Sequence, residues 1–248
     1  LSISRDSYYQ NVINSNRFEV AENLSKLEKE IDKTEWGMVP HIVNAYYNPL
    51  LNEIVFPAGI MQKPFFSENY EDAVNYARMG AVIGHEFTHG FDDMGSKYDA
   101  KGQMNDWWTE ADKNKFGEKT QKLIDQYNSF EVLEGVFVNG ELTLGENIAD
   151  FGGLTIAYHA YARSLEGKDQ ELIDGYSPAQ RFFIAFAHVW KNNIRDNALV
   201  TRVSTDPHSP GKYRVNGTLS NMPEFFEAFD IKEGDSMRQP ADKIAKIW

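Results

Sequence analysis

The residues of this sequence best suited to chemistry form a His-Glu-x-x-His motif at positions 85–89, within a run over 71–90 that is predicted to be helical. On an α-helix, positions four apart lie one turn apart on the same face, so His85 and His89 can direct two imidazoles at one metal ion. Glu86 is rotated partly off that face, where it can reach a water molecule held by the metal without being a ligand. The motif predicts half of a zinc site with a base beside it, but a motif this short also arises by chance, so further ligands are needed.

The third ligand should come from a separate element and leave a fourth position open for water. Glu146 is the best candidate, and Asp150 follows it by four residues at the start of a helix predicted over 146–165. Both acids can then face one site, with Glu146 as ligand and Asp150 holding a ligand histidine in one tautomer. A solvated acidic helix N-terminus would explain the pair taken alone. The apolar continuation IADFGGLTIAY favours the metal, because carboxylates entering a buried helix need a cation or hydrogen bonds.

Bulk composition limits the remaining possibilities. The 248 residues are 42% hydrophobic and carry a formal net charge of -12, which suits a folded domain and disfavours nucleic acid as a partner. No apolar run is long enough to span a membrane, and no signal sequence opens the chain, so no membrane partner is expected within it. Cysteine is absent, so a metal must be held by His, Asp or Glu.

Periodicity and turn residues predict a mainly helical order of elements around these motifs. A stripe of Phe18, Ala21, Leu24, Leu27 and Ile31 is expected to be core. The predicted elements before the motif are amphipathic helices over 5–16 and 18–31 and a strand pair over 41–47 and 53–56. The motif helix over 71–90 is followed by a long loop over 91–108, a helix from a cap at Thr109 to 129, and a hairpin over 132–144 turning at Asn139-Gly140. Helices over 146–165 and 178–194 and a loop-rich tail over 203–248 with a short aromatic helix complete the chain.

Several stretches taken together resemble one known family. They are NAYYNP from position 44, VFPAGI, PFFS, VIGHEFTHGFDD, GENIADFGGL, DPHSPGKYRV and the final Ile247-Trp248. The conjunction is similar to the catalytic half of neprilysin-type (M13) zinc metallopeptidases, relatives of endothelin-converting enzyme and bacterial oligopeptidase O. The resemblance implies an α+β, predominantly α-helical fold, a thermolysin-like zincin (gluzincin) with a small β-sheet, and one catalytic domain over 1–248.

The resemblance also implies the roles of the site residues. It makes His85, His89 and Glu146 the ligands of one Zn²⁺ ion, Glu86 the general base and Asp150 the group that orients a ligand histidine, as the spacing had proposed. It adds His208, which would stabilise the developing oxyanion, and Arg214, which would hold a substrate carbonyl. Without the resemblance, His208 would be read as a capped loop histidine and Arg214 as a surface charge.

Further residues are implied to contact a peptide substrate. Asn44 and Ala45 match the family motif that pairs with the substrate backbone in the manner of an added strand. The family's apolar pocket for the side chain just after the scissile bond maps onto Ile60, Phe65, Val82 and Trp190. Ordinary core packing would explain each of these four equally well.

The predicted function is that of a zinc-dependent endopeptidase acting on short peptides, with a preference for a hydrophobic residue after the scissile bond.

Family members are more than twice this length, and a helical region that covers the active site is expected to be missing here. The alternative is therefore a truncated zinc-binding domain that binds peptides with little turnover; a zinc hydrolase of non-peptide substrates is weaker. Secreted animal members of this family carry disulfides, so the resemblance together with the lack of cysteine implies a bacterial type, cytoplasmic or, alternatively, exported or at the cell surface.

Overall fold

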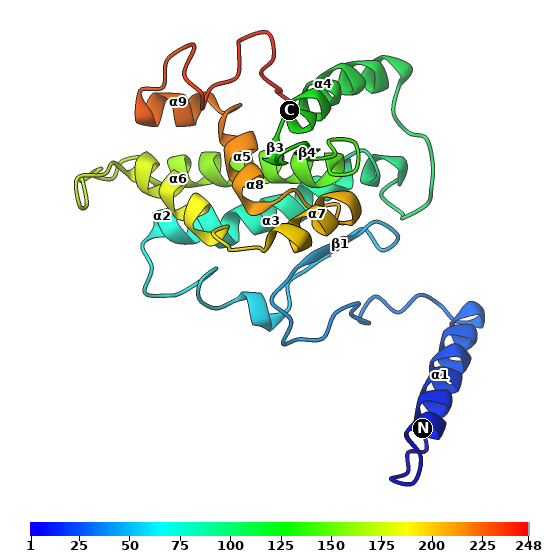
Figure 1. Ribbon diagram of the computed structural model, residues 1–248. Coiled ribbons are helices and arrows are strands. Elements are labelled where there is room, and N and C mark those ends of the chain that lie inside the picture. The colour runs from blue at the N-terminus through cyan, green and yellow to red at the C-terminus, as the bar shows by residue number, and fades with distance from the viewer. Residues whose placement is uncertain (248) are drawn as a thin grey trace. The chain divides into compact units, whose positions relative to one another are not determined.

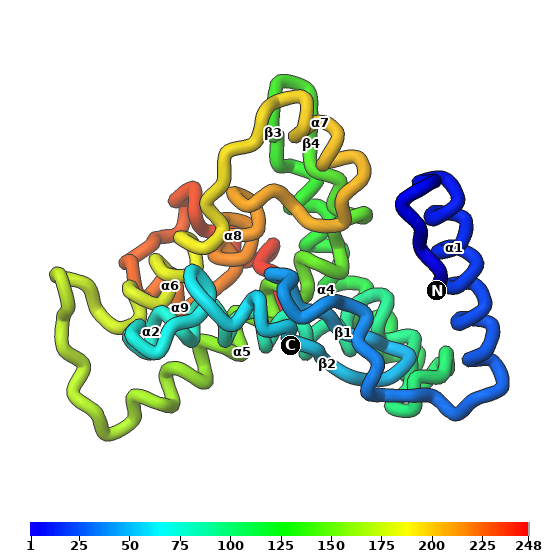
Figure 2. The backbone as a smooth tube through the Cα atoms, turned by 90° about the horizontal axis from the view of Figure 1, so that it is seen from below, coloured from blue at the N-terminus to red at the C-terminus, as the bar shows by residue number. Residues whose placement is uncertain are grey.

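The structure is a computed structural model that describes residues 1–247, so that Trp248, the last residue of the family resemblance, lies outside the described residues. The chain divides into two compact units, Leu1–Gly37 and the remainder from Met38 onward. Figures 1 and 2 follow the chain through both in two views. Each unit is described by itself below.

The first unit consists mainly of one helix, α1 (Tyr8–Ser25), followed by a 3-10 turn over Lys26–Glu28. The prediction of two helices over 5–16 and 18–31 was wrong, and so was the assignment of the stripe to the core. Phe18, Leu24 and Leu27 are 46%, 60% and 81% exposed. An amphipathic stripe is buried only where a second element covers it, and this unit contains no other long element.

The motif lies at the end of a continuous helical segment in the second unit. It begins as α2 (Asp72–Asn75), passes through a π-helical turn over Tyr76–Gly80, and continues as α3 (Ala81–Thr88) and a 3-10 turn over His89–Phe91. The helix predicted over 71–90 is therefore confirmed. The π turn inserts an extra residue into the helical repeat and so changes which side chains face the site further along.

Helix α5 (Leu144–Ser164) packs unusually close to α3 and sets the distance between the two halves of the site. A Cβ added to Gly84 would lie 2.6 Å from the carbonyl oxygen of Gly153, and one added to Gly152 would lie 2.7 Å from the Thr88 side chain. Only glycine allows this approach at both points. The glycine before His85 and the two glycines of FGG therefore let the two helices bring their metal ligands close together.

The core lies around α5 and is built by other helices of the second unit. Among its fully buried side chains are Tyr127, Ile148, Leu154, Phe182 and Phe183. The helices that contribute to it include α4 (Glu110–Asn128), α6 (Pro178–Val189), α8 (Gly211–Leu219) and α9 (Pro223–Phe229), whereas α7 (Asp196–Thr205) contributes none of the described residues of this core.

Two helix starts follow their predicted caps. The Thr109 side chain accepts from the backbone N–H of Asp112, and Ser177 forms a complete capping box with Gln180 ahead of α6. Helix α6 ends at Val189 rather than at 194, because the backbone leaves the helical region at Trp190.

The strands form two small antiparallel sheets. The predicted pair is confirmed in shorter form as β1 (Tyr46–Asn48) and β2 (Glu53–Val55), with Tyr47 opposite Ile54. The second pair is β3 (Glu131–Leu133) and β4 (Val136–Phe137). The architecture is thus mostly helical with small sheets, as predicted.

The hairpin turn was predicted at the wrong position. The chain turns at Gly135, which has a φ of 71°, and not at Asn139-Gly140. The Asn139 side chain instead accepts from the N–H of Leu142, and the Gly140 N–H donates to Asn128. These bonds lead the chain into α5 rather than back along a strand.

The tail was predicted to be loop-rich, but the structure adds α7 and α8 to the expected helix α9. Helix α8 has weak helix formers such as Gly211, Asn216 and Gly217, and its buried side chains, among them Tyr213 and Leu219, stabilise it through packing. The loop over 91–108 is confirmed apart from one 3-10 turn. Within the described residues, no helix combines the length and apolar character that crossing a bilayer requires.

Candidate active site

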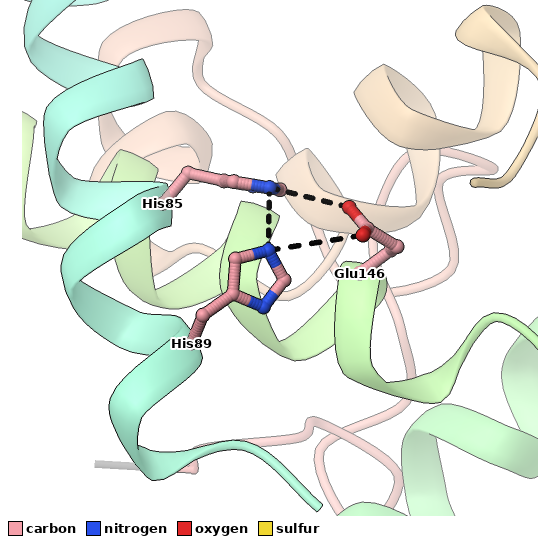
Figure 3. A group of neighbouring side chains, drawn as sticks. All are labelled: His85, His89 and Glu146. Carbon is pink, nitrogen blue, oxygen red and sulfur yellow. Dashed lines mark hydrogen bonds and ion pairs between the residues drawn. The ribbon is translucent and has the colours of Figure 1, made fainter. Parts of the chain in front are cut away.

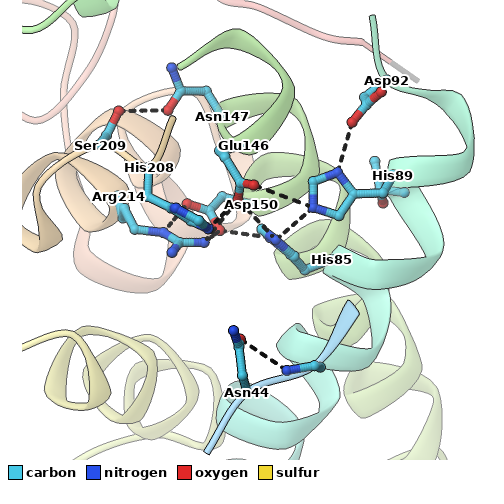
Figure 4. Close-up of polar contacts among 12 residues, drawn as sticks. Asn44, His85, His89, Asp92, Glu146, Asn147, Asp150, His208, Ser209 and Arg214 are labelled. Atoms are coloured by element: carbon cyan, nitrogen blue, oxygen red, sulfur yellow. Dashed lines mark hydrogen bonds and ion pairs between the residues drawn. The ribbon is translucent and has the colours of Figure 1, made fainter. Parts of the chain in front are cut away.

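The two motif histidines are each held in one tautomer by a buried carboxylate (Figure 4). His85 Nδ1 lies 2.9 Å from Asp150 Oδ1, and His89 Nδ1 lies 2.7 Å from Asp92 Oδ2. An ionised carboxylate only accepts hydrogen bonds, so each Nδ1 carries a proton, and in the neutral ring each Nε2 presents a lone pair. The two Nε2 atoms face each other at 3.0 Å. Two nitrogens at this distance need a positive ion between them, either a proton or a metal ion.

Glu146 completes a triangle of ligand atoms with these two nitrogens (Figure 3). Its carboxylate oxygens lie 3.2 Å from His85 Nε2 and 3.7 Å from His89 Nε2. A tetrahedral zinc ion with bonds of about 2.1 Å would hold its ligands about 3.4 Å apart. Oε2 of Glu146 is also buried without a hydrogen bond of good geometry. The donor set, its spacing and this unsatisfied oxygen all fit a zinc ion.

The electrostatics of the site favour positive charge at the same point. Burial works to lower the pKa of His85, but its bonds to Asp150 and Glu146 outweigh burial and raise that pKa to about 9. Burial alone would raise the pKa of Glu146, yet the hydrogen bond and charge of His85 lower it. The pocket therefore stabilises a carboxylate beside a cation, which is the arrangement a metal site needs.

Asp150 and Arg214 form a buried ion pair behind His85. Arg214 Nε and an Nη lie 2.6 and 2.5 Å from the two Asp150 oxygens. Burial raises the pKa of Asp150, but the charge of Arg214 and the bonds from His85 and Arg214 outweigh it and hold that pKa well below its usual range. The Arg214 guanidinium also stacks 4.0 Å from the ring of Trp190. Arg214 is thus largely engaged with protein groups, while it still lines the cavity.

Removal of the Arg214 guanidinium should destabilise the folded protein. We expect Arg214→Met to lower the free energy of unfolding by about 3–5 kcal/mol, because the buried Asp150 carboxylate would lose its guanidinium and keep only the bond from His85. Denaturant titration of the metal-free protein measures the loss. The double variant Arg214→Met with Asp150→Leu should recover much of it, and Lys113→Met, which breaks an exposed pair, should change little. A wild-type-like midpoint for the single variant would contradict this account.

Glu86 is 5% exposed and lines the same cavity as the ligands. Burial of its carboxyl raises the pKa of Glu86, although the charges of His85 and His89 counteract it in part. A raised pKa moves a carboxylate toward the range in which it can take and return a proton at neutral pH. This is the physical requirement for the base that the motif predicts.

His208 approaches Glu146 from the opposite side, with its Nε2 3.2 Å from Glu146 Oε2. Its Nδ1 and its backbone N–H both lie 2.8 Å from Asp206 Oδ1. The next residue, Ser209, is fully buried and donates to Asn147 on α5 at 2.8 Å. The loop after α7 is therefore tied to α5, which fixes the imidazole facing the cavity.

Every residue predicted for the site lines one cavity of about 510 Å³. Ala45 is buried ahead of β1, and the Asn44 side chain accepts from the Ala45 N–H at 2.9 Å (Figure 4). The predicted apolar residues also line the cavity: Ile60, Phe65 and Val82 share a small cluster with Ala45, and Trp190 packs against the main core. The structure thus brings the predicted set together, while the role of each residue stays a prediction.

Sequence reasoning missed three residues that act on this site. Asp92 and Asp206 hold His89 and His208, and both could have been suspected from their positions three residues after and two residues before those histidines. Arg78 lines the cavity from the π turn, and its sequence context carried no signal.

Comparison with known proteins identifies the family. The model described as Peptidase family M13 matches residues 44–244. The chain belongs to peptidase family M13. Among its M13 relatives, Neprilysin-3 of Drosophila melanogaster is 43% identical over the whole of this chain, which covers 32% of that protein. Neprilysin of Homo sapiens is 42% identical over the whole chain, which covers 34% of it.

Solved structures of M13 proteins agree with this assignment. The Mycobacterium tuberculosis zinc metalloprotease Zmp1 in complex with inhibitor matches with a TM-score of 0.96 at 43% identity, over 100% of this chain and 39% of that one. PepO from Lactobacillus rhamnosis matches with a TM-score of 0.78 at 38% identity, over 88% of this chain and 33% of that one. The family and fold predicted from the motifs are confirmed. The chain spans about a third of the length of the curated relatives it matches.

Proposed function

We propose that this chain carries the catalytic site of a zinc-dependent endopeptidase that hydrolyses internal bonds of short peptides. The observation that carries the proposal is the pair of Nε2 atoms facing each other at 3.0 Å beside the Glu146 carboxylate, next to a buried Glu86. His85, His89 and Glu146 would hold one zinc ion. When bound, the zinc lowers the pKa of a water molecule and polarises the peptide carbonyl.

Glu86 is proposed as the group that moves the proton. Its carboxylate would take a proton from the attacking water and pass it to the nitrogen of the leaving amine, so the nucleophile is water rather than a protein group. The raised pKa of Glu86, caused first by its burial, suits both steps.

His208 is proposed to stabilise the oxygen that gains negative charge in the transition state. Its Nδ1 donates to Asp206, and Nε2 is directed at the site beside Glu146, where it would donate to this oxygen in the imidazolium form of the ring. A donor placed in advance at such an oxygen typically contributes about 10²–10³ in rate.

The cavity wall supports binding of an extended peptide. Asn44 and Ala45 precede β1 at its open side and offer backbone groups for pairing with a substrate strand. Ile60, Phe65, Val82 and Trp190 would surround the side chain after the scissile bond and favour apolar contact with it.

Metal dependence of turnover tests the proposal. An internally quenched peptide should be cleaved by the full-length protein, a chelator should abolish cleavage, and added Zn²⁺ should restore it. Mass spectrometry of the products should show cleavage at an internal bond. Zinc retention and peptide binding without cleavage would instead support a peptide-binding module, and chelator-insensitive cleavage would overturn the zinc mechanism.

A further inference from the structure

Arg78 is a positively charged residue in the wall of the cavity, and it has no role in the proposed mechanism. It is 8% exposed and lines the cavity together with Phe65, Val82 and Trp190. Its Nε donates to the carbonyl oxygen of Ala185 at 3.1 Å, and Nη1 donates to that of Pro64 at 2.9 Å. These two acceptors immediately precede Phe65 and Phe186, which line the cavity, so the guanidinium is anchored at the edge of the apolar wall.

The charge of Arg78 is not paired within the part of the chain that the structure describes. Its third nitrogen, Nη2, lies 3.3 Å from His188 Nδ1, and its guanidinium carbon lies 5.4 Å from the centre of the Tyr70 ring. All of these partners are uncharged when His188 is neutral, and the pKa of His188 is lowered, first by desolvation and then by the charges of Lys191 and Arg78. A buried charge with only neutral partners is costly, so an anion at this point would be stabilised.

Another arginine of the same chain shows the contrasting case. Arg181 also joins two parts of the fold, but its Nε lies 2.9 Å from an oxygen of Glu71, with which it forms an ion pair. It does not line the cavity. Arg181 therefore has a carboxylate of its own, whereas Arg78 has none among the described residues.

The distance from the ligands fits a side chain of the substrate. Arg78 precedes His85 by seven residues, which at about 1.5 Å per residue places it about 10 Å along the helix from the first ligand. The π turn that contains it sets its orientation. A long side chain that enters the apolar part of the cavity beside the ligands would bring its end toward this guanidinium.

We propose that Arg78 makes this pocket selective for a side chain with an apolar stem and a terminal carboxylate, so that glutamate is accepted after the scissile bond. The proposal rests on the proposed peptidase function and deepens it. The walls contact the methylene groups, and the guanidinium, which has N–H groups beyond the three used by the protein, binds the carboxylate.

The test uses peptides that differ only at that position, carrying Glu, Gln or Leu. With the wild-type protein we expect kcat/KM for Glu to exceed that for Gln. Arg78→Met should lower the ratio of kcat/KM for Glu over Leu by at least about tenfold, because the carboxylate would be buried unpaired. Arg78→Lys should keep most of the ratio, since it retains the charge.

Arg181→Met is the matched control, because it removes a half-buried structural arginine outside the cavity and should leave the ratio unchanged. Using a ratio makes the result independent of how much folded protein each variant yields. Equal use of Glu and Gln by the wild type, or an unchanged ratio in Arg78→Met, would overturn this inference alone. Failure to cleave any of the peptides would overturn the peptidase function and the inference with it.

Discussion

Replacement of Glu86 by glutamine should lower kcat for a peptide substrate by about 10²–10⁴-fold while leaving the zinc content unchanged. Glu86 is buried in the cavity wall beside the ligands but supplies none of the converging ligand atoms. Glutamine has nearly the same shape and cannot take a proton from water. The loss should therefore fall on the chemical step, with little change in metal or peptide affinity.

The measurement combines steady-state kinetics with elemental analysis of the same sample. Glu118→Gln is the control, because it makes the same chemical change at an exposed position of α4. Wild-type turnover by Glu86→Gln with its zinc in place would remove Glu86 as the base. Loss of zinc would show instead that Glu86 supports the metal, for which the described contacts give no reason.

Local sequence patterns foresaw the parts of the site that depend on helical geometry. The four-residue spacings His85–His89 and Glu146–Asp150 each place two groups on one helix face, and in the structure Glu146 meets the Nε2 side of the histidines while Asp150 meets His85 at Nδ1. The contact between the two helices required more than periodicity. It depends on glycines at 84, 152 and 153, which were visible in the sequence but acquire their meaning only when the helices are placed together.

Groups that act across the fold were harder to predict. Spacing alone gave no reason to pair Arg214 with Asp150, because the two are joined only when α8 packs against α5. Asp92 lay in a stretch read as an acidic loop, and its role follows from a single bond to His89. The prediction that the apolar stripe of α1 is buried was wrong for the converse reason. Periodicity shows which face of a helix is apolar, but it cannot show that another element covers that face.

Loss of the Glu146 carboxylate should have the largest effect on metal binding. We expect Glu146→Gln to lower zinc affinity by more than the roughly 10–100-fold that loss of a supporting partner causes, since a ligand itself is removed. The two histidine nitrogens would remain, held by Asp150 and Asp92, but the site would lose its only anionic ligand. Competition with a chromogenic chelator measures the affinity, and elemental analysis the occupancy.

Asp92→Asn gives the graded comparison, because it leaves all three ligands in place, keeps an oxygen for the N–H groups of Met94 and Gly95, and removes the acceptor for His89 Nδ1. It should lose about 10–100-fold in zinc affinity and so fall between the wild type and Glu146→Gln. The ranking of the two zinc affinities is a stronger test than either affinity alone. A general loss of stability would weaken zinc binding in both variants without ranking them this way. If Glu146→Gln bound zinc as tightly as Asp92→Asn, Glu146 would not be a ligand, and the unsatisfied oxygen that it directs at the two histidines would need another explanation.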